Sequence, residues 1–320
     1  MTFRYCAFGL SIKSNVPLPS FAPLLQDGQI DLEISFSVDS APHSTAQCSD
    51  RVLETAECRP CETILMTSWD GQYARFVATE SFSCIRASCW PGQALDNAVA
   101  YFMGPILRLV TVCRGLFGLH AGGVAYGQDA ILVVGFQGAG KSTLLATLGA
   151  LGGIVFADDL TVLLVDEGRW VACSGAREVK LLPDALAAGH SRARAAARPQ
   201  WDLSQVAAAP GEAAKFVVPT EGGAITTRYR LGGIYILEAR SNDIQRPSLA
   251  RLGKAAATAH LAPHLPCVSR ELAHFRQARM AASRLAGLAS AVPVWTVSQP
   301  DDLSSVRDTA HALLETSNRA

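Results

Sequence analysis

One stretch constrains this chain more than any other: residues 131–143, Ile-Leu-Val-Val-Gly-Phe-Gln-Gly-Ala-Gly-Lys-Ser-Thr. Ile131–Val134 is an apolar run rich in β-branched residues, and Leu144–Leu151 is rich in leucine and alanine. The segment between them, which we call the glycine loop (Gly135–Thr143), therefore joins a predicted buried strand to a predicted helix. In this order of strand, loop and helix, loop N–H groups and the positive end of a helix dipole converge on phosphate.

The spacing Gly135-x-x-x-x-Gly140-Lys141-Ser142 assigns a chemical task to each part of the loop. Glycines let the backbone fold closely around phosphate oxygens, where a Cβ would collide. Lys141 would neutralise the β- and γ-phosphates of a nucleotide, whose identity the loop leaves open, and the Ser142 hydroxyl would ligate Mg²⁺. The predicted nucleotide contacts in the loop are Gly135, Gln137, Gly138, Ala139, Gly140, Lys141, Ser142 and Thr143. The alternative is a chance glycine turn between a strand and a helix.

Two adjacent carboxylates follow the next predicted strand. Ile154–Ala157 is short and apolar, and Asp158 and Asp159 stand at its C-terminal end. We expect this strand to return beside the strand of the glycine loop, because ligands in open α/β sheets bind at the C-terminal ends of strands. One carboxylate would accept a proton from an attacking hydroxyl and the other would help to hold Mg²⁺, and the residues alone leave open which is the base. A solvated acidic loop is the alternative.

Three further groups of polar residues are candidates for the site. His120 comes just before the hairpin that leads into the glycine loop, which favours contact with the aspartates or the γ-phosphate over a purely structural role. Lys215 is a candidate phosphate clamp. The arginines within residues 192–198 are weaker candidates, because basic residues in loops are usually solvated.

The chain before the glycine loop divides into a β-rich region and a helix. Period-two alternation in residues 1–93, clearest at Ile30–Val38, indicates half-buried strands in an antiparallel sheet or small sandwich. Ala94–Arg114 has helical spacing, and we expect Pro105 to kink it. The predicted parts are therefore residues 1–93 and a phosphate-binding α/β domain over residues 94–320, in which 94–114 is a linking helix.

After the aspartates the pattern departs from a regular doubly wound sheet. Leu160–Val165 and Arg169–Cys173 predict a hairpin where a further helix would be expected. The C-terminal part predicts helices over residues 248–265 and 269–290, a strand over 292–297, and a last helix over 301–316 behind a Pro300-Asp-Asp capping signal.

The composition limits the class of protein and its partners. With 320 residues, 49% of them hydrophobic and 18% charged, the chain predicts a globular protein of enzyme size. Its formal net charge of zero gives no broad attraction to nucleic acid or an anionic membrane. No apolar run reaches the about 18 residues of a membrane helix, and the N-terminus lacks a secretory pattern, so we expect a cytoplasmic protein. The nine cysteines do not suggest a disulfide framework, and metal binding by Cys58 and Cys61 stays open.

Four segments are distinctive in combination: His120-Ala-Gly-Gly-Val, Val134-Gly-Phe-Gln-Gly-Ala-Gly-Lys-Ser-Thr, Ala157-Asp-Asp-Leu and Val179-Lys-Leu-Leu-Pro-Asp-Ala-Leu. In this order they resemble the catalytic domain of the HPr kinase/phosphorylase family. The opening Phe8-Gly-Leu-Ser-Ile-Lys-Ser-Asn-Val-Pro-Leu-Pro is similar to the start of a divergent branch encoded with ribosomally made peptides, which includes the lasso-peptide precursor kinases. The resemblance spans most of the chain. It implies an α/β fold, a P-loop catalytic domain with a mixed sheet and helices, preceded by the β-rich region.

The same resemblance implies a Mg²⁺- and ATP-dependent serine kinase, with roles assigned by position. Lys141 and Ser142 would bind phosphate and metal. Asp158 would act as base on the accepting serine, Asp159 would support the metal, and His120 would orient the two aspartates.

Thr143 stands where the HPr kinases have a glutamate, and no counterpart of their later glycine-rich phosphorylase signature is evident. Both departures favour a kinase without the reverse reaction, and a precursor peptide as substrate in place of HPr. Two other functions stay open: a P-loop small-molecule kinase of the shikimate or gluconate type, and a nucleotide-sensing module without catalysis. The long region before the loop argues against the first, and the complete set of acid/base candidates argues against the second. The oligomeric state is also open, a homo-oligomer included.

Overall fold

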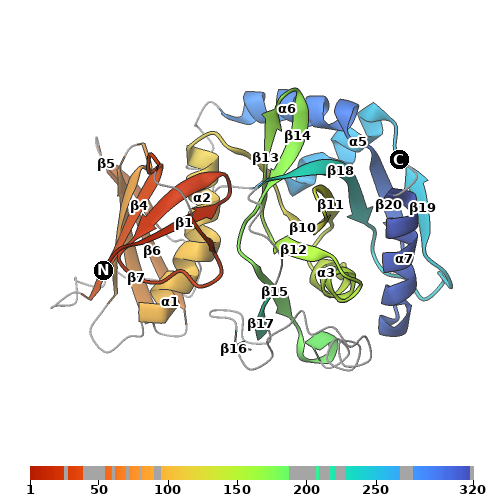
Figure 1. Ribbon diagram of the computed structural model, residues 1–320, viewed down its shortest axis with the longest axis horizontal. Coiled ribbons are helices and arrows are strands. Elements are labelled where there is room, and N and C mark those ends of the chain that lie inside the picture. Colours follow the sequence, from red (N-terminus) through yellow and green to blue (C-terminus); the bar gives the residue numbers. More distant parts are fainter. Residues whose placement is uncertain are drawn as a thin grey trace.

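The computed structural model describes residues 1–24, 28–38, 55–59, 62–69, 72–79, 81–89, 95–186, 207–208, 216–220, 228–266 and 277–317. The chain forms a mixed α/β fold with two large sheets and one small sheet (Figure 1). In the part of the chain that is described, no helix is long and apolar enough to cross a membrane.

The first large sheet has eight strands in the order β3-β1-β2-β4-β8-β7-β6-β5. Strand β4 pairs in parallel with β2 and with β8, while the other pairs are antiparallel. The expected antiparallel pairing is therefore wrong for the two pairs of β4, because period-two alternation indicates which face is buried and not the direction of the neighbouring strand. The strands are β1 Phe3–Ala7, β2 Leu10–Ser14, β3 Ala22–Pro23, β4 Leu32–Val38, β5 Thr55–Arg59, β6 Glu62–Trp69, β7 Gln72–Thr79 and β8 Cys84–Cys89.

The helix predicted over residues 94–114 is present but interrupted. Its pieces are α1 Leu95–Tyr101, the π-helical turn η1 Phe102–Ile106 and α2 Leu107–Cys113. Pro105 lies inside the π-helical turn, so the helix is irregular at this residue, and the expected kink stays a prediction. The buried side chains of these helices pack on the eight-stranded sheet; Phe102, for example, meets Phe36 edge to face with ring centroids 5.8 Å apart. The predicted domain boundary between residues 93 and 94 stays a prediction.

The second large sheet has nine strands around the long strand β18. Its main path is β12-β10-β11-β18-β14-β13-β9; β20 also pairs with β18, and β19 pairs with β20. The predicted hairpins, β10 with β11 and β13 with β14, are confirmed, as is the short strand β12. The strands are β9 Phe117–Leu119, β10 Ala121–Tyr126, β11 Asp129–Val134, β12 Ile154–Ala157, β13 Thr161–Asp166, β14 Arg169–Cys173, β18 Arg228–Leu237, β19 Ser248–Arg251 and β20 Val294–Ser298.

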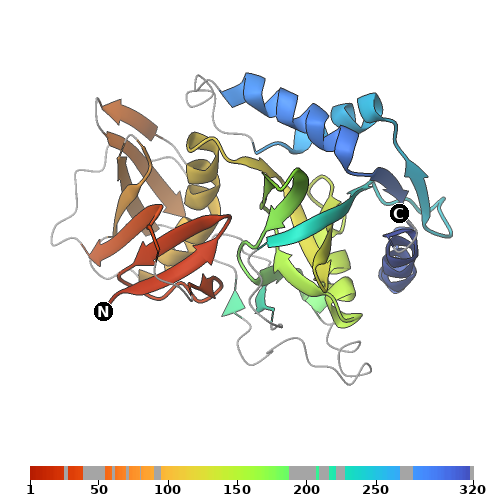
Figure 2. The same ribbon diagram turned by 45° about the horizontal axis from the view of Figure 1, so that its top comes forward.

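Strand β11 is buried on both faces, which explains its uninterrupted apolar sequence. Leu132 and Val134 belong to a core with α5 and α6, whereas Ile131 and Val133 belong to a core with α3 and α7. Helices therefore cover both faces of the sheet (Figures 1 and 2). The helices are α3 Lys141–Ala150, α5 Lys254–Leu261, α6 Gln277–Ala291 and α7 Val306–Ser317, with the 3-10 turns η3 Ala262–His264 and η4 Leu303–Ser305.

The helix predicted over residues 248–265 is wrong at its start. Ser248–Arg251 forms β19, which pairs antiparallel with β20, and α5 begins only at Lys254. Tertiary pairing overrides the weak local preference of this short segment. The capping signal before the last helix is confirmed: the Asp302 carboxylate accepts a hydrogen bond from the Ser304 N–H at 3.0 Å, at the turn that leads into α7.

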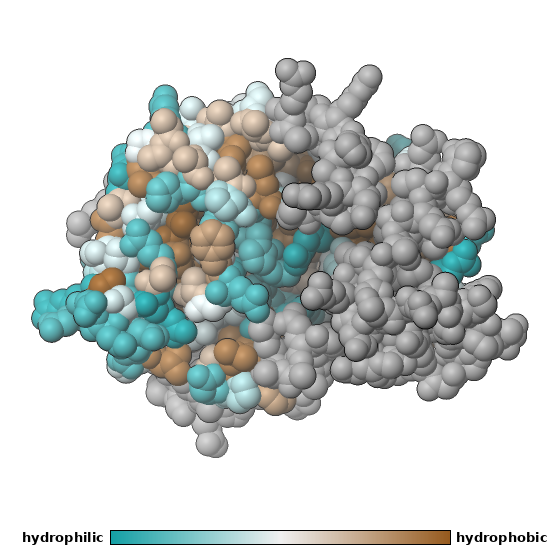
Figure 3. Space-filling model, turned by 180° about the vertical axis from the view of Figure 1, so that it is seen from behind, coloured by the Kyte–Doolittle hydropathy of each residue, from teal (hydrophilic) through white to brown (hydrophobic). Residues whose placement is uncertain are grey.

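A small sheet flanks the second large sheet. Its order is β15-β17-β16, with β15 Glu178–Leu181, β17 Phe216–Pro219 and β16 Ala207–Ala208. Strand β15 packs beside both β12 and α3, next to the glycine loop and the aspartates. On the described part of the face seen in Figure 3, apolar residues are scattered among hydrophilic ones.

Candidate active site

The glycine loop connects the end of β11 to the start of α3. Gly138 and Gly140 have φ angles of +84° and +92°, in the left-handed region that favours glycine. An added Cβ at either position would meet no atom within 4 Å, so the need for glycine there is conformational. At Gly135, in contrast, a Cβ would lie 3.1 Å from the Cβ of Ala139 and 3.2 Å from the carbonyl oxygen of Leu237. Within the loop, close packing against the protein itself thus favours glycine at Gly135, and not at Gly138 or Gly140.

Lys141 opens helix α3 and is only 9% exposed. Its Nζ donates hydrogen bonds to the carbonyl oxygens of Gly135 at 2.7 Å and Phe136 at 3.3 Å. The ammonium group is therefore folded over the loop that precedes it. A cation and the N-terminus of α3 meet at the same loop, which is a favourable setting for an anion.

The remaining predicted loop residues differ in exposure. Gln137 is exposed, whereas Ala139 is buried and its carbonyl oxygen accepts a hydrogen bond from Gln299 Nε2 at 2.8 Å. Thr143 is half-buried in the first turn of α3, where its carbonyl oxygen accepts from the Thr147 hydroxyl. The loop is thus anchored through Ala139 to the segment that follows β20.

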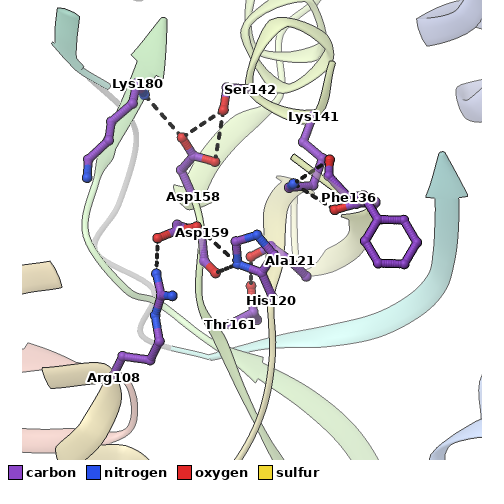
Figure 4. Close-up of polar contacts among 11 residues, drawn as sticks. Arg108, His120, Ala121, Phe136, Lys141, Ser142, Asp158, Asp159, Thr161 and Lys180 are labelled. Atoms are coloured by element: carbon purple, nitrogen blue, oxygen red, sulfur yellow. Dashed lines mark hydrogen bonds and ion pairs between the residues drawn. The ribbon is translucent and has the colours of Figure 1, made fainter. Parts of the chain in front are cut away.

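Asp158 and Asp159 stand at the C-terminal end of β12, as predicted, but β12 is not beside β11. Strand β10 lies between them, because the hairpin partner of β11 already occupies that side. Asp158 nevertheless reaches the first turn of α3, where the Ser142 hydroxyl donates to its carboxylate at 3.1 Å (Figure 4). From β15, the backbone N–H of Lys180 donates to the same carboxylate at 3.1 Å.

Asp159 faces a different set of partners. Its φ of +77° is unusual for a residue other than glycine and turns its side chain toward Arg108 of α2. The carboxylate forms an ion pair with Arg108 and lies 3.0 Å from Nδ1 of His120. The same Nδ1 lies 2.7 Å from the Asp159 carbonyl oxygen, so His120 contacts both the backbone and the side chain of this residue (Figure 4).

The two surroundings move the two pKa values in opposite directions. Burial, reinforced by the neighbouring charge of Asp159, raises the pKa of Asp158 from 3.8 to about 6, although the Lys180 N–H and the Ser142 hydroxyl oppose the shift. Burial also acts to raise the pKa of Asp159, but the hydrogen bond from His120 and the charges of Arg108, His120 and Lys180 outweigh it and lower that pKa. Asp159 is therefore ionised, while Asp158 can exchange a proton near neutral pH.

A second histidine supports the first. The backbone N–H of His120 donates to the carbonyl oxygen of His264 at 2.7 Å, and the buried His264 ring lies 4.8 Å from the ring of Phe136 in the glycine loop. Burial, with the nearby charges of His120 and Lys141, lowers the pKa of His264 to about 4. A neutral His264 thus fills the space between the loop and His120.

Arg108 and Lys180 are not predicted from the sequence as site residues. A signal exists for Arg108, which is the one basic residue between Leu95 and Cys113 on a largely apolar helix. Lys180 lies in a segment singled out by the family resemblance, but its N–H contact to Asp158 depends on the fold. We call the whole group the aspartate cluster: Arg108, His120, Asp158, Asp159 and Lys180.

Several predictions fall on parts of the chain without a description. Lys215, residues 192–198, Cys61 and the side chain of Cys58 lie outside what the structure describes. The phosphate-clamp role of Lys215 therefore stays a prediction, and metal binding by the two cysteines stays open.

Comparison with known proteins adds little to this geometry. No family model matches the chain, and no curated protein matches its sequence. Among solved structures, the HPr(Ser) kinase/phosphatase from Coxiella burnetii is similar at 10% sequence identity and a TM-score of 0.31, over 63% of this chain and 99% of that chain. Because this TM-score is low, any assignment of function depends on the residues of the site.

Proposed function

We propose that this chain is a kinase that transfers the γ-phosphoryl group of ATP, with Mg²⁺, to a serine hydroxyl of a peptide or protein. One observation carries the proposal. The carboxylate of Asp158, with a pKa raised to about 6, lies 3.1 Å from the Ser142 hydroxyl in the first turn of the helix that follows the glycine loop. A proton acceptor and a phosphate-binding motif thus share one site.

In this proposal, the glycine loop and the N-terminus of α3 bind the phosphates, and Lys141 leaves its loop carbonyls to neutralise them. Mg²⁺ prefers oxygen ligands and keeps several waters, so the Ser142 hydroxyl in the first turn of α3 suits it. Ser142 would hold the ion, which supplies charge neutralisation at the phosphates. A metal role for Asp159 would require its carboxylate to exchange Arg108 and His120 for the ion, and stays a prediction.

The proposed transfer assigns one role to each aspartate. The serine Oγ forms a bond to the γ-phosphorus while the bond from that phosphorus to the β,γ-bridging oxygen breaks, and ADP leaves. The serine proton passes to Asp158, which is ionised above pH 6 and so can accept it at neutral pH. Asp159, held by Arg108 and His120, keeps its charge beside Asp158.

For the acceptor, we propose a ribosomally made precursor peptide of the lasso type, in a cytoplasmic setting and without nucleic acid or membrane as partner. The motif resemblance supports this choice, and Thr143 in the loop favours a kinase without phosphorolysis. The edges of the eight-stranded sheet, β3 and β5, could bind an extended peptide by strand addition.

The first test is transfer of radiolabel from Mg-[γ-³²P]ATP by the full-length protein. The acceptors are candidate precursor peptides of the lasso type, their serine-to-alanine variants and a metabolite pool. We expect label on one serine and none with EDTA. Asp158→Asn should lower the transfer rate by about 10²–10⁴-fold, since a general base contributes that much, with MgADP binding retained.

Asp166→Asn is the matched control, because Asp166 pairs with Arg228 at the other end of β13 and is half exposed. It should transfer label like the wild type. Label on a metabolite with all peptides inert would favour a small-molecule kinase. ATP binding without transfer to any acceptor would favour a nucleotide-sensing module.

A further inference from the structure

Arg108 is the one member of the aspartate cluster that comes from the helices packed on the eight-stranded sheet. Helix α2 buries Leu107, Leu109 and Val110 in the core of that sheet. From the same helix the Arg108 guanidinium reaches across to the Asp159 carboxylate (Figure 4). The ion pair therefore joins the first large sheet to the proposed reaction centre on the second.

The surroundings of Arg108 argue against a role in stability alone. Its Nε is buried and makes no hydrogen bond with any described residue. An unsatisfied buried donor is destabilising and rare in folded proteins. An apolar side chain of similar length would fill the same space without that penalty, so the guanidinium is explained better by what it does to Asp159.

Asp159 needs external support. A residue other than glycine at φ +77° is strained, and such conformations persist only where surrounding contacts determine them. Two residues supply such contacts here: His120 Nδ1 lies 2.7 Å from the Asp159 carbonyl oxygen and 3.0 Å from its carboxylate, and Arg108 binds the carboxylate. Because Asp158 is the preceding residue, the direction of its side chain toward Ser142 depends on this turn of the backbone.

The segment between β2 and β3 also supports Asp158, from a second side. The carbonyl oxygen of Ser20 accepts from the Arg177 N–H at 2.7 Å, and the Ser20 hydroxyl donates to Glu178, the first residue of β15. Two residues later on this strand, the Lys180 N–H donates to Asp158. Both aspartates are thus held through contacts that lead back to the N-terminal part of the chain.

We infer that Arg108 is a positioning residue: by anchoring Asp159 in its left-handed conformation, it keeps Asp158 directed at Ser142 and the glycine loop. The inference rests on the proposed kinase function for its effect on rate. The effect of Arg108 on the position of Asp158 is independent of that function, because the contact between Asp158 and Ser142 can be observed without any acceptor. This role makes helix α2, which packs on the eight-stranded sheet, a component of the active site.

The test uses full-length Arg108→Ala and Arg108→Met, of which the second keeps the apolar stem packed. Crystal structures of the wild type and of Arg108→Met should show the Asp158–Ser142 hydrogen bond lost in the variant. Transfer to the peptide should fall by about 10²-fold in kcat, as expected for a small misplacement of a reacting group, with MgADP affinity unchanged. Added guanidinium ion should restore part of the activity of Arg108→Ala, and Arg108→Lys should retain more activity than Arg108→Ala.

Arg228→Ala is the control, since this arginine also pairs with an aspartate, Asp166, but on the exposed end of a hairpin. It should change neither kcat nor the Asp158–Ser142 contact. The inference is overturned if that contact survives in Arg108→Met, if MgADP affinity falls together with kcat, or if guanidinium restores nothing. A wild-type protein that transfers to no acceptor would refute the proposed function, and the crystal structures alone would then decide the role of Arg108.

Discussion

The glycine loop and the aspartate cluster face each other across the proposed site but are built in different ways. The loop is one continuous segment, and its lysine bonds to carbonyl groups only five and six residues away. In the cluster, Arg108 and Asp159 are 51 residues apart, and Asp158 and Lys180 are 22 apart. The lysine and the left-handed glycines of the loop therefore depend on local backbone conformation, whereas the cluster depends on the packing of several elements. Changes in the two regions should have different signatures.

The largest effect on nucleotide binding is expected in the loop, at Lys141. Lys141→Met removes the cation that would neutralise the phosphates, so we expect ATP binding and phosphoryl transfer to fall together, by about 10²–10³-fold. Calorimetry with MgADP and the labelling assay measure the two quantities. Lys254→Met is a matched control, because Lys254 also opens a helix, α5, but is exposed. If Lys141→Met bound nucleotide as the wild type does, the loop would lose its proposed role.

In the cluster, we expect a substitution of Asp158 to raise the free energy of unfolding at high pH. The pKa of Asp158 is about 6 in the folded protein against an ordinary 3.8, so the folded state binds this proton more tightly than the unfolded state. Stability then falls as pH rises from 3.8 through 6 and stays lowered above. Asp158→Asn should therefore be more stable than the wild type at pH 8, by about 1–3 kcal/mol, and equal to it below pH 3.8.

Urea unfolding at pH 8 and at pH 3.5 measures this difference, with Asp166→Asn expected to stay within about 0.5 kcal/mol of the wild type at pH 8. Such a gain would be typical of a group retained for activity at the expense of stability. A loss of stability in Asp158→Asn at pH 8 would indicate that the ionised carboxylate stabilises the fold, and would contradict this prediction.

The smallest effect tests the local character of the loop. Gly140→Ala places a Cβ where there is open space but at φ +92°, so we expect a loss of about 1–2 kcal/mol from backbone strain alone. Gly28→Ala also has open space around it and no left-handed φ, and should change stability by less than about 1 kcal/mol. Thermal unfolding of both variants is the measurement. Equal losses of stability in Gly140→Ala and Gly28→Ala would mean that the left-handed backbone conformation of Gly140 causes no strain with alanine.

Much of the second sheet could be predicted from the sequence, because its signals are local. The hairpins β10–β11 and β13–β14, strand β12 and the start of α3 follow from apolar runs and turn residues. Pairing between distant strands could not be predicted. Period-two alternation says nothing of strand direction, so the parallel pairs of β4 in the first sheet were not expected. The insertion of β10 between β11 and β12 likewise depends on which edge the hairpin occupies.

The sequence by itself determined the glycine loop, since the left-handed glycines, the lysine and the serine are neighbours along the chain. It also identified Asp158, Asp159 and His120 as candidates. Only the tertiary structure decided that Asp158 meets Ser142 while Asp159 meets Arg108, and that Lys180 donates to Asp158. The physical reason is that burial and ion pairing give two identical, adjacent side chains different pKa values, and both depend on elements that only folding brings together.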